Sequence, residues 1–356
     1  MSAPYPSPAF TAFGILGTVT RNAGRHEITG WAVAPDAGPI DALRVFVGAR
    51  EVAATSTTGR SSPEVAAANP TLPDAANAGF TISITDDAVG GAIEDELLAV
   101  VPFSGGRPGN PIFTLVQPTV VLPTDETLKI TGGSFKAAYE FLGYFLGFCE
   151  LRPDQSVLEV GCGCGRMAYP LAYYLQPPGR YEGFDIVTRL IDSARDGVTT
   201  TRPHVRFQVA DVFNSVYNRA GKQKSSEFVF PYPDASFDFV FLTSVFTHMY
   251  PADVRRYLSE IRRVLRPGGR VLMTCFLRTP DAVVAIDEGR SSQSLRHPRE
   301  ECWIAKPEAP EFAVGFAPEQ FFAWVEAAGF AVERFAPGFW CGRPRRVSYQ
   351  DIVVAS

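Results

Sequence analysis

Three alternating glycines follow a short apolar segment and could form a ligand-binding turn. Residues 157–160 are apolar apart from Glu159, and Gly161, Gly163 and Gly165 come directly after them. Glycine is needed where a chain turns sharply and a ligand must approach the backbone closely. A helical pattern of apolar residues follows, so the order strand, glycine turn, helix predicts a nucleotide-binding loop. An ordinary glycine-rich turn without a ligand is the alternative.

The spacing of the glycines differs from that of a dinucleotide-binding loop. The third glycine of G-x-G-x-x-G would fall at Arg166, whereas this chain has G-x-G-x-G with Glu159 two residues upstream. That pattern resembles motif I of class I S-adenosylmethionine (SAM) methyltransferases, whose ligand has no pyrophosphate. The resemblance implies SAM contacts along the turn, at Glu159, Gly161, Cys162, Gly163, Gly165 and Arg166.

Two acidic residues stand at the ends of the next predicted strands. Asp185 ends a strand over residues 180–187, and Asp211 follows a strand over residues 205–209. A carboxylate at the first position can accept hydrogen bonds from both ribose hydroxyls of an adenosine ligand. A carboxylate at the second position can accept a hydrogen bond from the adenine amino group. Helix caps or loop acids are the alternative. The neighbouring residues expected at the cofactor are Ile186, Val212 and Phe213.

Later segments strengthen the resemblance to this methyltransferase family. They are residues 230–240, residues 244–249 and residues 265–269, and the likeness extends over about residues 132–356. It implies that Ser244 lies near the methionine part of SAM. The departure is Cys164, where Thr or Ser is common, but a small side chain suffices there.

His248 is the candidate catalytic residue. Methyl transfer is an in-line displacement that depends on alignment of donor and acceptor. An alcohol acceptor also needs a base, and histidine titrates in a suitable range. A histidine that caps a helix or lines the pocket without chemistry is the alternative. Tyr250, Trp340 and Arg343 are weaker candidates for the acceptor pocket, although the last two could belong to a turn between the final strands.

Several signatures are absent from the sequence. The Asn/Asp-Pro-Pro-aromatic motif of amino-group methylation does not follow Thr243, and no carboxylates have the spacing of a catechol-type magnesium site. Both absences favour an aliphatic hydroxyl as the acceptor. The six cysteines form no C-x-x-C pair, so we expect neither a metal site nor a disulfide framework.

Composition limits the partners. The chain has 356 residues, 46% of them hydrophobic and 20% charged, which suggests two domains with packed cores. Residues 1–120 account for the whole formal net charge of −5, so nothing predicts nucleic-acid binding. No apolar run predicts a membrane span, and residues 1–10 do not resemble a signal peptide. We therefore expect a cytoplasmic protein, with an oligomer possible.

Turn signals and periodicity predict the organisation of the chain. We expect a flexible tail over residues 1–12, an all-β sandwich over residues 13–116 and a Pro-rich linker over residues 117–127. Residues 128–356 are expected to form the α/β methyltransferase domain, with a doubly wound, mostly parallel, seven-stranded sheet. Within it, residues 281–310 read as a polar, irregular insert or lid.

These observations predict a SAM-dependent O-methyltransferase. Turns and one tryptophan between residues 28 and 80 loosely resemble β-sandwich modules of bacterial glycan-modifying enzymes, which favours a sugar or glycan hydroxyl as the acceptor. Two alternatives stay open. The acceptor could be a small natural product, or the chain could be a glycan-binding protein that retains a non-catalytic methyltransferase fold.

Overall fold

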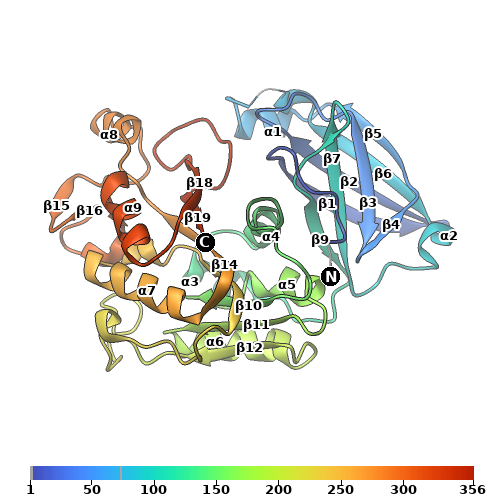
Figure 1. The fold of residues 1–356 in the computed structure, drawn as a ribbon. Coiled ribbons are helices and arrows are strands. Elements are labelled where there is room, and N and C mark those ends of the chain that lie inside the picture. The colour runs from blue at the N-terminus through green and yellow to red at the C-terminus, as the bar shows by residue number, and fades with distance from the viewer. Residues whose placement is uncertain (1–2, 73) are drawn as a thin grey trace. The chain divides into compact units, whose positions relative to one another are not determined.

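The computed structural model describes residues 3–72 and 74–356 and contains both helices and sheets (Figure 1). The chain forms two compact units. The first unit comprises Met1–Asp154, Arg166–Pro177 and Asp196–His204. The second unit comprises Gln155–Gly165, Pro178–Arg195 and Val205–Ser356.

Antiparallel strands build two sheets in the first unit. One sheet has the order β1 (Phe13–Asn22), β2 (Arg25–Val33), β6 (Gly79–Thr85), β5 (Thr55–Arg60). The other has the order β4 (Arg50–Val52), β3 (Ala42–Val47), β7 (Glu96–Ser104), β8 (Arg107–Pro108), with β9 (Ile112–Val116) also paired to β7. Buried residues of both sheets, such as Ile28 and Val100, share one apolar core, as alternating side chains on facing sheets require.

The first unit also contains helices that the predicted boundaries assign elsewhere. Its helices are α1 (Pro63–Ala68), α2 (Asp86–Val89), α3 (Asp125–Thr131), α4 (Lys136–Cys149) and α5 (Ala168–Tyr174), with short turns at Ala75–Asn77 and Arg195–Thr199. Helix α4 packs on β9, where the Tyr139 hydroxyl accepts a hydrogen bond from the Leu115 N–H at 3.2 Å. The compact units thus differ from the predicted division, because residues 128–154, 166–177 and 196–204 belong to the first unit. Independent folding of residues 1–116 stays a prediction.

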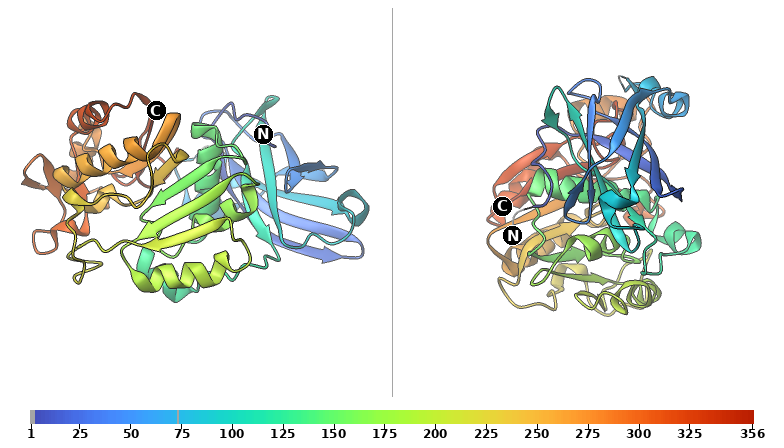
Figure 2. Two further views of the ribbon diagram at one scale, coloured as in Figure 1. Left: turned by 60° about the horizontal axis from the view of Figure 1, so that its bottom comes forward. Right: turned by 90° about the vertical axis from the view of Figure 1, so that its right-hand side faces the viewer.

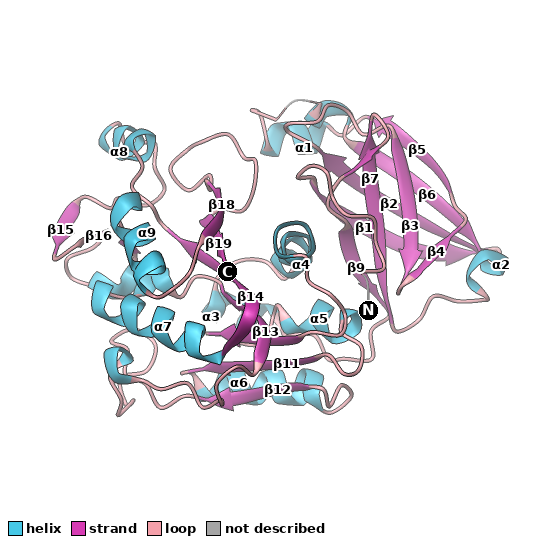
Figure 3. Cartoon of the chain, in the orientation of Figure 1, coloured by secondary structure: helices cyan, strands magenta, loops and turns pink. Residues whose placement is uncertain are grey.

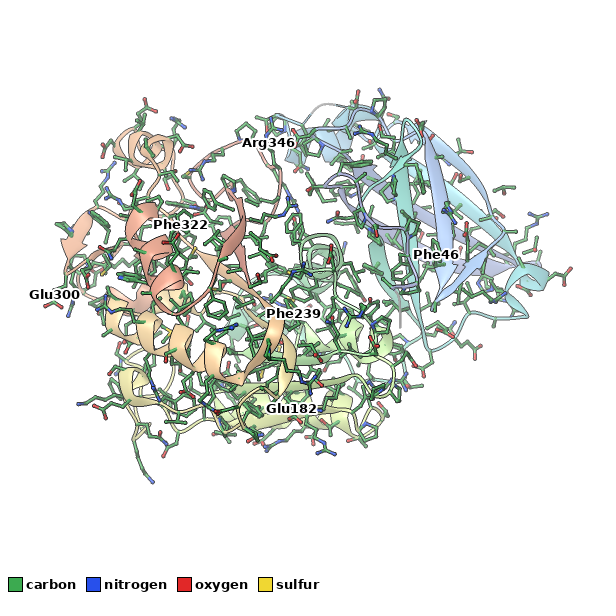
Figure 4. All side chains as sticks on the ribbon, in the orientation of Figure 1. Phe46, Glu182, Phe239, Glu300, Phe322 and Arg346 are labelled. Atoms are coloured by element: carbon green, nitrogen blue, oxygen red, sulfur yellow. The ribbon has the colours of Figure 1, made fainter. Side chains whose placement is uncertain are left out.

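The predicted flexible tail is anchored where the structure describes it. Tyr5 is buried, its hydroxyl donates to the Gly48 carbonyl at 3.1 Å, and its ring lies 5.2 Å from that of Phe46 and 5.5 Å from that of Phe113. Phe46 is labelled in Figure 4. Burial raises the pKa of the Tyr5 hydroxyl. The expectation of a loose tail is therefore wrong for residues 3–12, because the side chain of Tyr5 packs in the core. Residues 1–2 lie outside the described residues.

A seven-stranded mixed sheet forms the centre of the second unit (Figure 3). Its order is β12 (Val205–Val209), β11 (Arg180–Asp185), β10 (Ser156–Val160), β13 (Phe237–Leu242), β14 (Leu265–Cys275), β19 (Asp351–Ala355), β18 (Val332–Ala336). The first five strands are parallel to one another, and β19 runs antiparallel to both of its neighbours. Strands covered on both faces are buried along their whole length, as β10 and β19 are. The expected α/β class and seven strands are present.

Helices α6 (Thr188–Ala194), α7 (Pro251–Val264), α8 (Pro280–Asp287) and α9 (Pro318–Ala327) belong to the second unit. Helix α6 contacts β11 and β12, as Figure 2 shows. Helix α7 contacts β14 and α9 through a buried apolar stripe that includes Val254 and Ile261. Phe322 of α9, labelled in Figure 4, packs edge-on against Phe335 of β18 at 5.6 Å. No helix in the described ranges has both the length and the apolar character that a membrane crossing requires.

The predicted irregular insert has regular structure. Residues 281–310 contain most of α8 and two strands, β15 (His297–Arg299) and β16 (Cys302–Ile304), which form a small sheet with β17 (Val314–Gly315). Buried residues of α8, such as Ile286, pack in a satellite core with Trp340. The prediction of an irregular segment was wrong because the apolar residues that hold it are few and their partner lies far along the chain.

Asp95 joins distant segments of the first unit. Its carboxylate accepts hydrogen bonds from the Tyr173 hydroxyl at 2.5 Å, from Thr119 at 2.8 Å and from the Arg202 guanidinium at 2.7 Å. Burial opposes its charge, but these donors together hold the pKa of Asp95 well below its usual range.

We expect Asp95→Asn to lower the free energy of unfolding by about 1–2 kcal/mol, because a neutral amide loses the Arg202 pair and one acceptor. Asparagine tolerates the left-handed backbone of this residue, which has a φ of 54°. Since folding lowers this pKa, the contribution is complete above the ordinary Asp pKa and is lost as pH falls through the folded value. Urea unfolding at pH 7 and pH 3 measures both effects. The exposed Asp87→Asn is the control, and equal loss in both variants would contradict the assignment.

Candidate active site

The glycine turn adopts a backbone that other residues rarely take. Gly161, Gly163 and Gly165 have φ values of +73°, +54° and +72° at the end of β10. A Cβ at Gly161 would lie 2.5 Å from Cγ2 of Val245, and one at Gly165 would lie 2.9 Å from the ring of Phe207. The glycines are therefore required by both backbone conformation and close packing.

Asp185 holds this turn from the neighbouring strand. Its Oδ2 accepts a hydrogen bond from the N–H of Gly163 at 2.8 Å, and its Oδ1 accepts one from the N–H of Val187 at 2.9 Å. Burial raises the pKa of the Asp185 carboxyl, and the N–H groups of Val187, Gly163 and Ile186 act in the opposite direction. A carboxylate has about four lone-pair sites, so acceptor capacity remains for the hydroxyls of a ligand.

The side chains between and before the glycines point into the core. Glu159 is 2% exposed and accepts a hydrogen bond from the Tyr181 hydroxyl. Cys162 and Cys164 are also buried, and burial raises the pKa of the Cys162 thiol well above its ordinary value. The structure thus buries the side chains of Glu159 and Cys162 beneath the turn. They could support ligand binding only indirectly, by holding the backbone of the turn in shape.

Arg166 follows the turn but is engaged elsewhere in the first unit. Its Nη1 donates to the carbonyl of Gly132 at 2.6 Å and lies 3.5 Å from the carbonyl of Ser134. The side chain therefore fixes the loop before α4. A direct contact of Arg166 with a cofactor stays a prediction.

Asp211 and its neighbours lie at the end of β12. The carboxylate of Asp211 is half exposed and accepts the Lys222 N–H at 3.2 Å. Phe213 is 45% exposed, whereas Val212 is buried in the main core. Phe213 and Asp211 are therefore accessible to a ligand, but the Val212 side chain is not. Ile186, after β11, is partly buried against the same core.

The sheet order places these groups side by side. The carboxyl ends of β12, β11, β10 and β13 are neighbours, so Asp211, Asp185, the glycine turn and Ser244 follow one another along a single edge. Adjacent strands are about 4.8 Å apart. A ligand extended along this edge would meet two acids first, then the turn, then Ser244, which is the usual place for ligands in open α/β sheets.

Ser244 has a strained backbone and two polar contacts. Its φ is +61°, which is uncommon for a non-glycine residue. Its N–H donates to Oγ1 of Thr274 at 2.8 Å, and its Oγ accepts a hydrogen bond from Nε2 of Gln350 at 2.7 Å. Such strain is found where surrounding contacts enforce it, often at functional sites.

His248 ends the short 3₁₀ turn Phe246–His248, which follows β13. Its Nδ1 lies 2.8 Å from the carbonyl of Glu311, which can only accept, so Nδ1 carries the proton and Nε2 keeps its lone pair. Burial lowers the pKa of His248 below its ordinary value, although the carbonyls of Glu311 and Phe312 partly oppose this. The imidazole is therefore neutral at pH 7 and can act as a base at Nε2.

Of the weaker candidates, Tyr250 and Arg343 are partly exposed, whereas Trp340 is not. The guanidinium of Arg299 lies 4.8 Å from the ring centroid of Tyr250. Trp340 has no exposed surface, and its Nε1 donates to Asp351 at 2.9 Å. Arg343 binds Thr279 and Asp281 and also lies 3.4 Å from Asp351.

The expectation that Trp340 lines an acceptor pocket is therefore corrected, because its side chain is buried against Asp351. Arg343 is partly exposed, and its contact with an acceptor stays a prediction. Asp351 lies at the centre of these contacts. Burial raises the pKa of its carboxyl to about 6, although hydrogen bonds from Leu277, Gly338 and Trp340 act to lower it. The sequence suggested a surface turn here because nothing marks Asp351 as buried.

Three residues that contact the site were not predicted from the sequence as cofactor or catalytic residues. Thr274 and Gln350 contact Ser244, and the backbone of Glu311 fixes His248. The one hint is that Thr274 is a polar residue within the apolar run of β14. Within the described part of the chain, no three His, Cys, Asp or Glu residues are grouped so that they could hold a metal ion.

Comparisons with known proteins identify the segment that carries the turn. Residues 157–269 match a family described as a methyltransferase domain. An uncharacterized 37.1 kDa protein of a Streptomyces fradiae transposon is 32% identical over 137 residues, 38% of this chain and 34% of that protein. The tRNA N(3)-cytidine methyltransferase METTL2 of Gallus gallus is 26% identical, over 38% of this chain and 34% of that protein.

A third relative is phosphoethanolamine N-methyltransferase 3 of Arabidopsis thaliana, 29% identical over 38% of this chain and 24% of that protein. The chain thus spans a third or less of the length of these relatives. The names of the second and third relatives give different acceptors for those proteins.

We expect Gly165→Ala to destabilise the protein by about 2–4 kcal/mol, because an alanine there combines a left-handed backbone with a clash against Phe207. Gly268→Ala is the matched control: its φ is +76°, but nothing lies within 4 Å of its added Cβ. That variant should lose only about 1 kcal/mol. Denaturant unfolding measures both, and equal losses would show that crowding at the turn is unimportant.

Proposed function

We propose that this protein is a SAM-dependent methyltransferase. The observation that carries the proposal is the order of groups along the sheet edge: Asp211, Asp185, the glycine turn and Ser244. SAM has the same order of parts, namely adenine, ribose, sulfonium and amino acid. The match of residues 157–269 to a methyltransferase domain supports the same conclusion independently.

The residues fit this cofactor. Asp185 can accept ribose hydroxyls while its bonds to Gly163 and Val187 keep the turn in place. Asp211 can accept the adenine amino group, and the exposed Phe213 can lie against the ring. When bound, SAM supplies an electrophilic methyl group on sulfur.

Within this proposal the acceptor is a hydroxyl, because His248 supplies a base. Nε2 of the neutral imidazole would accept the proton of the acceptor hydroxyl, and the oxygen would then be free to take the methyl group that SAM gives up as its methyl–sulfur bond breaks. The carbonyl of Glu311 keeps the proton of Nδ1 in place and stabilises the imidazolium that results. Burial of the imidazole keeps it unprotonated beforehand.

A sugar or glycan is the acceptor we favour, on the resemblance of residues 28–80 to modules of glycan-modifying enzymes. A small natural product is the second candidate, and a specific surface favours it. Two segments that contact His248, one through Tyr217 and one through Glu311, carry four exposed large apolar side chains: Phe213, Val216, Tyr217 and Phe312. The ring of Tyr217 lies 5.4 Å from that of His248, and the Ser215 N–H binds the Glu311 carboxylate at 2.8 Å.

That surface suits an acceptor with an apolar face, whether a sugar ring or an aromatic ring, better than a nucleic acid. A cytoplasmic location is part of the same proposal. A non-catalytic glycan-binding scaffold is less well supported, because such a protein would need neither the tightly packed turn nor a neutral, oriented His248. A panel of free sugars, nucleotide-linked sugars and hydroxylated aromatic compounds, assayed for S-adenosylhomocysteine release, separates these acceptors.

We expect Asp185→Ala to weaken SAM binding by roughly 10- to 150-fold, because hydrogen bonds to a charged acceptor contribute about 1.5–3 kcal/mol. Isothermal titration calorimetry with SAM measures the change. Asp192→Ala is the control, since Asp192 lies on the following helix with its side chain 59% exposed. Unchanged affinity in Asp185→Ala would remove the basis for the cofactor assignment.

We expect His248→Ala to lower turnover by about 10²–10⁴-fold while SAM affinity stays near that of the unaltered protein. His297→Ala, at an exposed position in β15, is the control. Because the base must be unprotonated and its pKa is lowered, activity should fall with decreasing pH only below the ordinary histidine value of about 6.5. That acid-side limb should disappear in His248→Ala. Full turnover in the variant would make His248 a wall of the pocket, and a parallel loss of SAM binding would make it a cofactor residue.

A further inference from the structure

Ser244, Thr274 and Gln350 form a closed ring of hydrogen bonds. The Ser244 N–H donates to Oγ1 of Thr274 at 2.8 Å, and Oγ1 of Thr274 donates to Oε1 of Gln350 at 2.6 Å. Nε2 of Gln350 then donates to Oγ of Ser244 at 2.7 Å. Thr274 is fully buried in β14, and Gln350 directly precedes β19. The ring thus ties the loop after β13 to two further strands.

The chemistry of the three groups fixes the direction of every bond. A backbone N–H can only donate, so Thr274 must accept from Ser244 and has one hydroxyl proton left to give. That proton goes to Gln350, whose amide must then present its oxygen to Thr274 and its nitrogen to Ser244. Ser244 Oγ is therefore an acceptor within the ring. Its own proton is not used there and is free to be donated outside it.

The strain at Ser244 shows that this orientation is enforced. A left-handed backbone at a non-glycine residue costs of order 1–3 kcal/mol and persists when its surroundings hold it. The Ser244 N–H bond to the buried Thr274 is such a restraint. Ser244 is itself only partly buried, so its hydroxyl can reach a ligand.

The position of Ser244 indicates which part of a ligand it meets. It lies at the end of β13, and Val245 next to it packs against Gly161 of the turn. The acids of β11 and β12 are on the other side of β10. If the proposed function is right, adenosine lies toward those acids, and the amino-acid half of SAM lies toward Ser244. In that half the carboxylate is the group that accepts hydrogen bonds.

We propose that Gln350 is a positioning residue: through the ring with Thr274 it makes Ser244 a hydrogen-bond donor to the carboxylate of the cofactor. Ser244 would then be the contacting residue, and Gln350 would act only through it. This inference rests on the proposed function and goes beyond it, because it assigns a role to two residues outside the glycine turn.

The test compares two probes by calorimetry. S-adenosylhomocysteine has the carboxylate, whereas 5′-methylthioadenosine has the same nucleoside and thioether without it. Gln350→Glu presents a carboxylate to Ser244, whose hydroxyl must then turn inward to donate. We expect this variant to bind S-adenosylhomocysteine at least about 10-fold more weakly, because one hydrogen bond to a charged group is lost. Its affinity for 5′-methylthioadenosine should stay the same.

Two further variants separate this effect from simple repulsion by the added charge. Gln350→Met removes the amide without adding charge. It should also weaken the binding of S-adenosylhomocysteine but not that of 5′-methylthioadenosine. In Ser244→Ala the donor is already absent, so adding Gln350→Glu should cause no further loss; an additional loss would mean repulsion and would overturn the inference. Gln320→Glu on α9 is the control for net charge, and thermal unfolding shows whether each variant is folded.

The possible failures are distinguishable. If the unaltered protein bound neither probe, the proposed function would fall, and this assignment with it. If it bound both, but Gln350→Glu and Gln350→Met bound S-adenosylhomocysteine as well as the unaltered protein does, only the role of Gln350 would be wrong. Equal weakening of both probes would make the ring a structural support of the whole site.

Discussion

The hydrogen bonds from the glycine turn to Asp185 are the interaction on which this site depends. One carboxylate at the end of β11 binds the N–H groups of Gly163 and Val187 and so couples the loop after β10 to the loop after β11. Those two loops come from strands that are neighbours in the sheet. This coupling acts together with the hydrogen bonds from the N–H groups of Gly161 and Cys162 to the carbonyl of Phe184. A carboxylate held in this way is also well placed to bind a ligand, because it does not have to rearrange.

A parallel sheet explains why separate loops can act together. Each parallel strand ends at the same edge, so residues far apart in the chain become neighbours in the order of the strands. Asp211, Asp185 and Ser244 span three strand ends on either side of the turn. Two of the relatives match this chain over 34% and 24% of their own length. The segment matched to a methyltransferase domain, residues 157–269, includes this sheet edge.

The segment around Glu311 contacts two residues of the candidate site. It fixes His248 through a backbone carbonyl and anchors Ser215 through its carboxylate. It thereby connects the candidate base to the loop that carries exposed apolar side chains. The carbonyl orients the imidazole, and burial lowers the pKa of His248 although the charge of the Glu311 carboxylate acts in the opposite direction. In the proposed function, one stretch of chain outside the segment 157–269 therefore supports both the base and the loop expected to meet the acceptor.

The sequence by itself determined the glycine turn, the acids after β11 and β12 and the seven-stranded α/β sheet, because these follow from local spacing and apolar periodicity. It also gave His248 as the base candidate. Only the tertiary structure decided the ring of Ser244, Thr274 and Gln350 and the burial of Trp340 against Asp351. The tertiary structure also decided the contact of Tyr5 with Gly48 and the packing of α4 on β9. The reason is physical: a hydrogen-bond partner or a core contact from a distant segment leaves no pattern in the local sequence, so it becomes defined only when the chain has folded.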